Sequence, residues 1–310
     1  MNELELIQLL TGSLPGNSTV IAGAGDDCAV LDLGIPGRYL LFKTDAVVEG
    51  LHFEPSTPPQ SIGHKALGRC LSDIAAMAGR PIAALATVAL PRGFDAAFVK
   101  QIYDGMSRLA RLHEVAIVGG ETTSKPERLL VSISALGDVG RDKCVFRSGA
   151  RAGDALFVSG ELGGSLEGKH LQFTPRLEQA RWLADHFSIH AMIDLSDGLA
   201  GDLRHILDSS RSGAELLASA IPISRAAKAA ARSRPGAKPP LLAALTDGED
   251  FELLFAVANR DGAPLLEAWR KQFPDLRLSC VGKVTDTGLL KLRDARGVHT
   301  LQAHGYVHFA

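Results

Sequence analysis

Apolar positions in the first half of the chain follow two different spacings. They recur at helical spacing from residue 61 to 79 and again from 96 to 113, which predicts two helices. Short apolar or alternating runs predict strands at residues 39–43, 82–90, 115–118 and 129–135. These elements alternate without the regular cadence of a barrel, which favours an α+β fold.

A polar, basic and glycine-containing stretch at residues 140–154 separates this half from a second series of elements. Beyond it the pattern predicts helices at 175–187 and from Ser196 toward Asp208, and strands at 155–159, 191–193, 251–257, 276–281 and 289–292. Residues 235–240 interrupt an alanine-rich helical stretch and predict an exposed loop. We therefore expect two α+β domains, residues 1–140 and 141–310.

Composition narrows the class of protein. The 310 residues are 46% apolar and 22% charged, which permits a sizeable core and excludes wholesale disorder. A net charge of -2 with few aromatic residues argues against binding to nucleic acid. Four cysteines without a CxxC pair are typical of core thiols in a reducing compartment. With no apolar run of ~18 residues and no signal-peptide pattern, we expect a cytoplasmic protein without a membrane span.

Six acidic residues lie in runs of small or apolar residues instead of beside Lys and Arg. An unpaired carboxylate is costly to bury in such a setting. Several carboxylates can converge only if cations neutralise their mutual repulsion. Hard oxygen ligands suit Mg²⁺ better than Zn²⁺, so the pattern favours a site for several Mg²⁺ ions. The six residues are Asp27, Asp45, Asp73, Glu121, Asp194 and Asp197.

The sequence around these acids supports a role in a binding site for some of them more than for others. Adjacent side chains of an extended segment point to opposite faces, so only one of Asp26 and Asp27 is expected to face a site. Asp45 follows a predicted strand, a common position for ligands in α/β-type sheets. Two glycines at a predicted strand end, residues 119–120, would let a ligand approach the backbone just before Glu121.

Other positions have ordinary structural alternatives. Asp73 lies at the polar edge of a predicted helix, where solvated acids are common. Ser196 is a candidate helix cap and Asp197 a candidate first-turn acid, although capping alone does not require Asp194 directly after an apolar strand. His52 is isolated, as structural histidines usually are.

Familiar nucleotide and hydrolase motifs are missing. The chain has no GxxxxGK[ST] loop and no GxSxG elbow, and its GAGDDC segment lacks the third glycine of a dinucleotide fingerprint. A bound nucleotide would therefore be held through metals and backbone amides.

Eight motifs in order resemble bacterial thiamine-monophosphate kinase, a member of the superfamily that includes aminoimidazole ribonucleotide synthetase. They span residues 20 to 310 and read GDDCAV, TDAVVEGLHF, LSDIAAMAG, GGETTS, RSGARAGD, IDLSDGLAGDL, GEDFELLF and GYVHF. The resemblance implies transfer of the γ-phosphate of ATP to thiamine monophosphate. It also implies an N-terminal domain whose mixed sheet dimerises into a homodimer, and a C-terminal α+β domain.

The resemblance also implies roles for individual residues that match the family's motifs. It assigns no side chain to covalent catalysis. The resemblance implies Mg²⁺ ligation by Asp27, Thr44, Asp45, Asp73, Glu121, Asp194 and Asp197. It implies nucleotide contacts from Gly120, Glu121, Arg147 and Ser196. His52, Glu249 and Tyr306 match positions that contact the thiamine phosphate.

Two positions depart from the family pattern. Glu121 stands where the kinases usually have Asp, and Lys43 replaces a small hydroxyl residue before Thr44 and Asp45. The related synthetases also use GGET, so one alternative is another ATP-using enzyme of the same superfamily. A second alternative is a non-catalytic nucleotide or metal sensor that kept the site.

Overall fold

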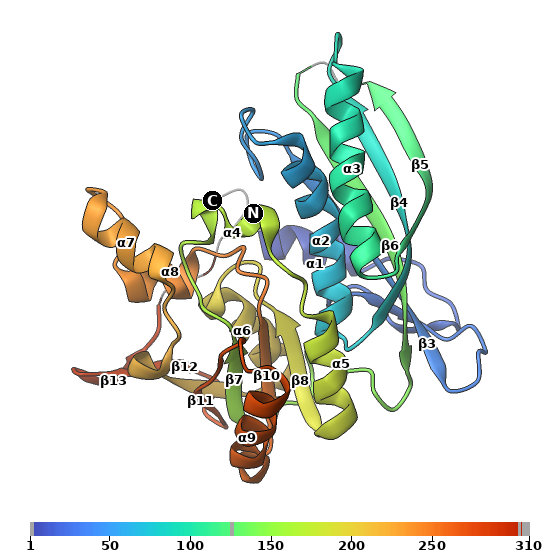
Figure 1. Cartoon of the computed structure of the whole chain (residues 1–310). Helices are drawn as coiled ribbons and strands as arrows, with labels where there is room; N and C mark the ends of the chain where they lie inside the picture. The colour runs from blue at the N-terminus through green and yellow to red at the C-terminus, as the bar shows by residue number, and fades with distance from the viewer. Residues whose placement is uncertain (1–2, 125–126, 303–304, 306–310) are drawn as a thin grey trace. The chain divides into compact units, whose positions relative to one another are not determined.

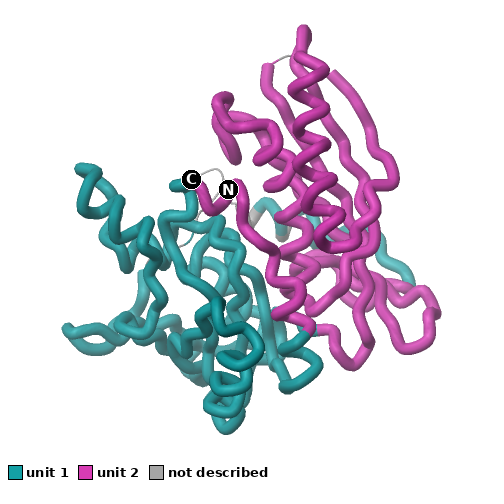
Figure 2. Tube along the Cα trace, in the orientation of Figure 1, with its two compact units in different colours: residues 1–18, 145–167, 182–310 teal, residues 19–144, 168–181 magenta. Residues whose placement is uncertain are grey.

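The computed structural model describes residues 3–124, 127–302 and 305 (Figure 1). They form two compact units, shown in separate colours in Figure 2. The N-terminal unit comprises residues 19–144 and 168–181, and the C-terminal unit comprises residues 1–18, 145–167 and 182–310. The α+β fold class is therefore confirmed. The expected domain boundary after residue 140 coincides with the end of a strand, whereas the two units divide after residue 144. In addition, residues 1–18 belong to the C-terminal unit and residues 168–181 to the N-terminal unit.

The N-terminal unit is built on a mixed six-stranded sheet with the order β1-β2-β3-β6-β4-β5. Only β4 and β5 run parallel, and the other neighbours are antiparallel. Its strands are β1 (Val20–Ala22), β2 (Ala29–Leu31), β3 (Arg38–Val48), β4 (Arg80–Leu90), β5 (Ala116–Ser124) and β6 (Leu130–Gly140). Its helices are α2 (Pro59–Ala76), α3 (Ala96–Leu112) and the short α4 (Lys169–Gln172).

Helices α2 and α3 cover one face of this sheet (Figure 1). Alternate residues of β6, Val131, Ile133 and Ala135, are buried on that face. A Cβ at Gly63 of α2 would overlap the carbonyl of Ile102 in α3, so the two helices require glycine to approach this closely. This packing holds α2 against the sheet and fixes the position of Asp73, the one acidic residue of α2.

The other face of the sheet, which we call the open face, carries exposed apolar side chains. Phe42 and Leu136 lie directly opposite each other on β3 and β6, and Leu85 lies on β4. Their exposed fractions are 47%, 36% and 46%. Such a patch on a sheet face is typical of an interaction surface.

The C-terminal unit contains a seven-stranded sheet with the order β13-β12-β9-β11-β7-β10-β8. All neighbours are antiparallel except β9 and β12. The strands are β7 (Ala155–Ser159), β8 (Ile189–Asp194), β9 (Gly213–Leu217), β10 (Leu253–Val257), β11 (Leu278–Thr285), β12 (Leu290–Asp294) and β13 (Gly297–Thr300). The central strands β7 and β10 are buried along their whole length, as their unbroken apolar sequences predict.

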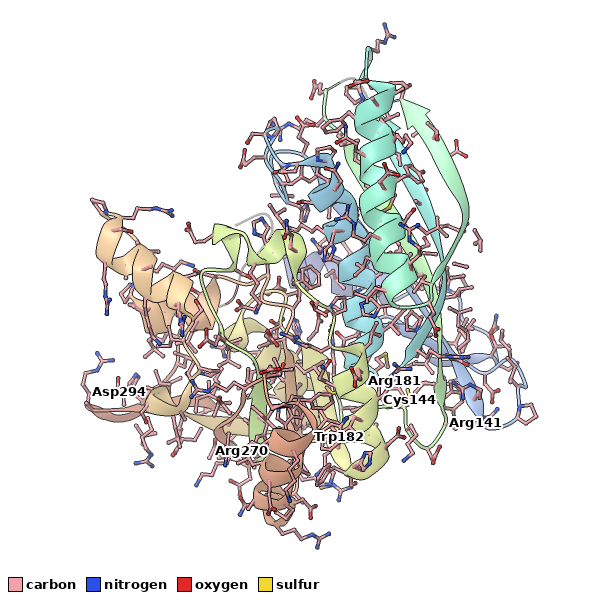
Figure 3. The ribbon with its side chains drawn as sticks, in the orientation of Figure 1. Arg141, Cys144, Arg181, Trp182, Arg270 and Asp294 are labelled. Atoms are coloured by element: carbon pink, nitrogen blue, oxygen red, sulfur yellow. The ribbon has the colours of Figure 1, made fainter. Side chains whose placement is uncertain are left out.

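Helices and an aromatic cluster complete this unit. The helices are α1 (Glu3–Thr11), α6 (Leu199–Ser210), α7 (Arg225–Ser233), α8 (Pro240–Thr246) and α9 (Gly262–Gln272), with 3-10 turns η1 (Ser165–Glu167), η2 (Ala218–Ala220) and η3 (Asn259–Asp261). Helix α5 (Leu177–His186) is divided, with its residues from Trp182 onward in this unit. Trp182, labelled in Figure 3, packs edge-on against Trp269 with ring centroids 6.0 Å apart. Trp269 is fully buried, and its indole N–H donates to the Leu276 carbonyl at 2.7 Å.

Several expected boundaries are wrong, and three of them have a clear local reason. The strand predicted at residues 39–43 continues to Val48, because its pairing with β6 extends past the polar residues Thr44 and Asp45. The strand predicted at 115–118 runs on to Ser124. A Cβ at Gly120 would overlap the Ala86 carbonyl of β4, so strand pairing itself requires glycine there. Helix α6 begins at Leu199 after an N-cap at Gly198, so Ser196 is not its cap.

Among the described residues, no helix is both long and apolar enough to cross a membrane.

Candidate functional site

The N-terminal unit brings Asp27 and Asp73 together. A carboxylate oxygen of each lies within 4.8 Å of the other. Asp27 is 1% exposed, whereas Asp26 is only half-buried, so one member of the pair faces inward. The N–H of Cys28 donates to the Met77 sulfur at 3.2 Å and anchors the Asp27 segment to the end of α2.

Two basic residues accompany the acids on this face. Lys43 and Asp45 are two apart on β3 and so point to the same side of the sheet, toward α2. Lys43 Nζ lies 2.9 Å from Asp73 Oδ1, and Arg69 Nη2 lies 3.7 Å from Asp45 Oδ1. The N-terminal cluster therefore contains the carboxylates of Asp27, Asp45 and Asp73 and two cations of the same chain.

Thr44 and Glu121 lie on the open face of the sheet. The Thr44 hydroxyl donates to the Ile133 carbonyl at 3.1 Å. Glu121 lies opposite Thr87 of β4, which is opposite Ser132 of β6. Strand β5 is three strands from β3, about 14 Å at the usual strand spacing. One chain therefore does not bring the Thr44 and Glu121 side chains to Asp45.

His52 lies in a tight turn that follows β3. The backbone N–H of Val48 donates to its Nδ1 at 3.1 Å, so the neutral ring carries its proton on Nε2. The ammonium of Lys65, a fully buried residue of α2, donates to the His52 carbonyl. These bonds fix the orientation of the imidazole ring.

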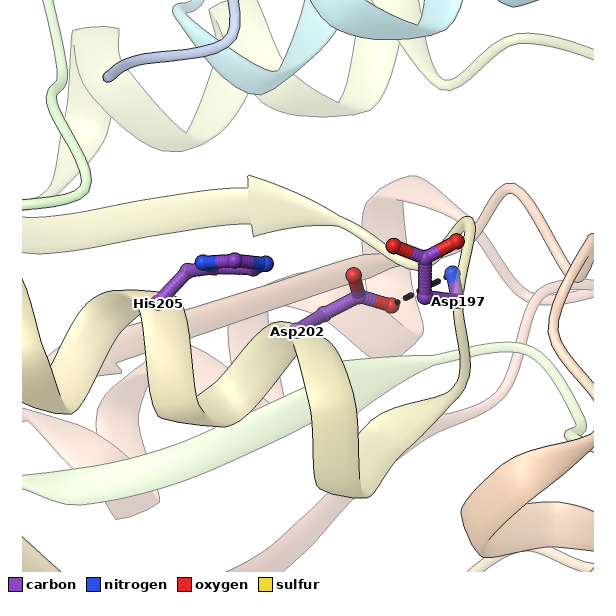
Figure 4. Close-up of side chains that lie close together, drawn as sticks. All are labelled: Asp197, Asp202 and His205. Atoms are coloured by element: carbon purple, nitrogen blue, oxygen red, sulfur yellow. Dashed lines mark hydrogen bonds between the residues drawn. The ribbon is translucent and has the colours of Figure 1, made fainter. Parts of the chain in front are cut away.

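The C-terminal unit places Asp194 and Asp197 around the end of β8. Asp194 is the last residue of that strand and is 4% exposed. The next turn is held by Asp202, whose Oδ2 accepts the backbone N–H of Asp197 at 3.0 Å (Figure 4) and that of Gly198 at 3.0 Å. Ligand atoms of Asp197, Asp202 and His205 lie within 4.8 Å of one another.

The charge of this C-terminal cluster is visible in the pKa of Asp202. Burial raises that pKa well above its usual value, and the neighbouring charges of Asp197 and Asp194 raise it further. The backbone hydrogen bond from Asp197 and the charge of Arg147 act in the opposite direction but do not cancel the rise. A cation in this cluster would relieve the repulsion between these carboxylates.

Asp202 and His205 are functional candidates that the sequence reasoning missed. Both lie on α6 within or just after the quoted motif IDLSDGLAGDL. The available signal was an acid in the first turn of a helix whose N-cap is a glycine, because such an acid can hold the preceding turn.

Glu249 is held in a strained segment beside the same turn. Glu249 and Phe251 adopt φ values of +54° and +50°, which non-glycine residues rarely do. The N–H of Glu249 donates to the Ser196 carbonyl at 2.7 Å, and that of Phe251 to the Leu195 carbonyl at 2.8 Å. Strain of this kind persists only where surrounding contacts impose it, and it is concentrated at functional sites.

Arg147 is anchored to α6. The Ser210 hydroxyl accepts the N–H groups of Gly149 and Ala150 at 3.2 and 3.1 Å, and it donates to the Arg147 carbonyl at 3.4 Å. Tyr306 lies outside the described residues, so its predicted role stays a prediction.

The N-terminal part of the chain is similar to AIR synthase-related proteins. Residues 25–139 match the family model of the AIR synthase related protein, N-terminal domain. The whole chain is 38% identical to the thiamine-monophosphate kinase of Rhodopirellula baltica, with 99% of this chain and 97% of the relative covered. It is 33% identical to that of Escherichia coli K12 over 93% of this chain and 92% of the relative.

A solved structure agrees with these relatives. The structure described as AaThiL complexed with AMPPCP and TMP superposes with a TM-score of 0.84 at 28% identity and covers 99% of this chain and 97% of its own. The chain therefore belongs to the thiamine-monophosphate kinase family. The family predicted from the eight motifs is confirmed, and so is the enzyme class, a kinase with a phosphate group as acceptor.

Proposed function

We propose that the chain transfers the γ-phosphate of ATP directly to thiamine monophosphate and releases thiamine diphosphate. The observation that carries this proposal is the similarity to thiamine-monophosphate kinases over 99% of the chain. The related structure with AMPPCP and TMP supports the choice of both substrates.

The donor set of the two clusters fits Mg²⁺. Asp27, Asp45 and Asp73 in the N-terminal unit, and Asp194 and Asp197 in the C-terminal unit, supply carboxylate oxygens, the ligands that Mg²⁺ prefers. Thr44 would contribute through its carbonyl, since its hydroxyl bonds across the sheet. When bound, Mg²⁺ screens the repulsion between two phosphates and stabilises charge on the leaving oxygen.

The chain's own side chains bind and orient the substrates. Arg147 offers a guanidinium to the ATP phosphates, and backbone groups of Gly120 and Ser196 are further proposed contacts of the nucleotide. His52 donates from Nε2 to the thiamine phosphate, and Glu249 faces the thiazolium cation together with Tyr306, which attracts it by a cation–π contact. An acceptor phosphate with a second pKa of roughly 6 is deprotonated at neutrality, so no general base is required. Positioning of two anions supplies most of the rate.

A product assay tests the proposal. With ATP, Mg²⁺ and thiamine monophosphate we expect thiamine diphosphate, with none from free thiamine and none after EDTA treatment. A synthetase-like activity predicts ATP hydrolysis that thiamine monophosphate does not stimulate. A sensor predicts ATP binding without turnover. Either outcome would refute the kinase proposal.

We also propose that the chain forms a homodimer through the open face of the N-terminal sheet. The exposed Phe42, Leu85 and Leu136 support this surface. Glu121 lies on the same face and far from Asp45 of its own chain, so we propose that it serves the site of the second copy. Sedimentation of a Leu85→Asp variant should shift to the monomer, whereas an unchanged dimer would exclude this face.

A further inference from the structure

Lys43 places a positive charge inside the N-terminal cluster. Its Nζ lies 2.9 Å from Asp73 Oδ1, and the side chains of Lys43 and Asp73 are only 22% and 10% exposed. The neighbouring side chains on this face of β3, Leu41 and Val47, are buried and apolar. A lysine at such a position is explained by the acids that it faces.

We propose that the Lys43 ammonium is a built-in cation that takes the place of one divalent ion among Asp27, Asp45 and Asp73. The inference rests on the proposed metal-assisted kinase function, in which these carboxylates bind Mg²⁺. A Mg²⁺ ion binds an oxygen at about 2.0–2.1 Å. An ion at that distance from Asp73 Oδ1 would meet the ammonium at close range, and the two like charges would repel each other.

The consequence is that the N-terminal cluster binds one divalent ion fewer than it would without the Lys43 ammonium. Lys43 pairs with one oxygen of Asp73, and Arg69 lies beside Asp45. The charge of the N-terminal cluster is therefore partly neutralised by side chains of the chain itself. Removal of the lysine charge should open a place for one further divalent ion.

Counting Mn²⁺ ions by electron paramagnetic resonance tests this inference on the full-length chain. The compared proteins are wild type, Lys43→Met, Lys43→Arg and Lys100→Met, the last a change at an exposed lysine of α3. We expect Lys43→Met to bind one more Mn²⁺ per chain than wild type. Lys43→Arg and Lys100→Met should bind the wild-type number. An unchanged or reduced number for Lys43→Met would overturn the inference.

A second measurement covers the case in which Lys43→Met does not fold. In wild-type protein labelled with ¹⁵N-lysine, the Lys43 ammonium signal, assigned by its absence from Lys43→Arg and so distinguished from that of the buried Lys65, should persist at saturating Mg²⁺. Its loss to solvent exchange would show that Mg²⁺ displaces Lys43 and would overturn the inference. The product assay reports on the kinase separately, because an extra ion in Lys43→Met supports the role of Lys43 even if no thiamine diphosphate forms.

Discussion

The two units hold their buried acids in different ways. In the N-terminal unit, basic side chains face the acids: Lys43 faces Asp73, and Arg38 and Arg80 both bond Asp138. In the C-terminal unit, backbone amides bond two of the buried acids. Asp202 accepts two of them, and Asp250 accepts the N–H of Gly163 at 3.0 Å.

The pKa values show what this difference means. For Asp138, burial acts upward, but hydrogen bonds from Arg38 and Arg80 and their charges outweigh it and lower the pKa. For Asp202, burial and neighbouring acids raise the pKa. Backbone amides orient a carboxylate without cancelling its charge, so we expect the Asp202 carboxylate to gain more from an added cation than Asp138 does.

The largest effect is expected at Asp194. Asp194→Asn keeps the shape of a buried residue but removes a proposed metal ligand, and kcat should fall by about 10²–10³-fold, as for loss of one transition-state stabiliser. Asp208→Asn changes an exposed acid of α6 in the same unit and should leave kcat unchanged. Steady-state kinetics at saturating ATP measures kcat for both variants. A near-normal kcat for Asp194→Asn would show that Asp194 is not a metal ligand of the site.

Mixing two inactive variants tests whether the site is shared between copies. If Glu121 serves the second copy, heterodimers of Glu121→Gln and Asp194→Asn regain one of two sites. After equal mixing and subunit exchange, about a quarter of wild-type activity should return, because half of the dimers are heterodimers. Activity no greater than that of the separate variants would place Glu121 in the site of its own chain.

A smaller effect is expected at Asp202. An asparagine at this position can still accept the N–H groups of Asp197 and Gly198, but it removes the charge. The Mg²⁺ concentration for half-maximal rate should rise about tenfold, equivalent to about 1.4 kcal/mol. Asp202→Glu, which keeps the charge, is the matched control. Identical Mg²⁺ titrations for Asp202→Asn and wild type would show that Asp202 only accepts the two backbone N–H groups and that its charge does not contribute to Mg²⁺ binding.

The smallest effect concerns the stability of the N-terminal unit. The folded-state pKa of Asp138 is depressed, so its contribution is present above the unfolded-state pKa and is lost as pH falls through the folded-state value. Asp138→Asn should lower the free energy of unfolding by about 1 kcal/mol at pH 7, a modest value because Arg80 is 60% exposed. Urea titrations should show the difference at pH 7 and none at pH 2, with Asp104→Asn as a surface control. A difference that persists at pH 2 would contradict the linkage.

The sequence predicted the fold where local pattern and burial agree. The strand predicted at residues 155–159 coincides with β7, and the helix predicted at 96–113 is α3 to within one residue. Strand β9 was missed because its five residues, GAELL, carry neither alternation nor a turn signal of their own. The exchange of residues 1–18 and 168–181 between the units depends on tertiary contacts that no local pattern encodes.

The candidate site was predictable in part for a similar reason. Motif order identified the acids, and Asp27 is buried beside a half-buried Asp26, although that one of them faces a site stays a prediction. The ion pair between Lys43 and Asp73 joins residues 30 apart and depends on how α2 packs on β3, so the sequence alone could not show it. The position of Glu121 on the open face depends on sheet order, which the sequence did not reveal.

A rapid-quench experiment with ATP labelled in the γ-phosphate tests the central proposal most directly. If positioning and charge compensation carry the reaction, the label passes in the first turnover to the terminal phosphate of thiamine diphosphate, and no labelled protein accumulates. Label that appears first on the chain and then moves to thiamine monophosphate would contradict direct transfer between the two phosphates.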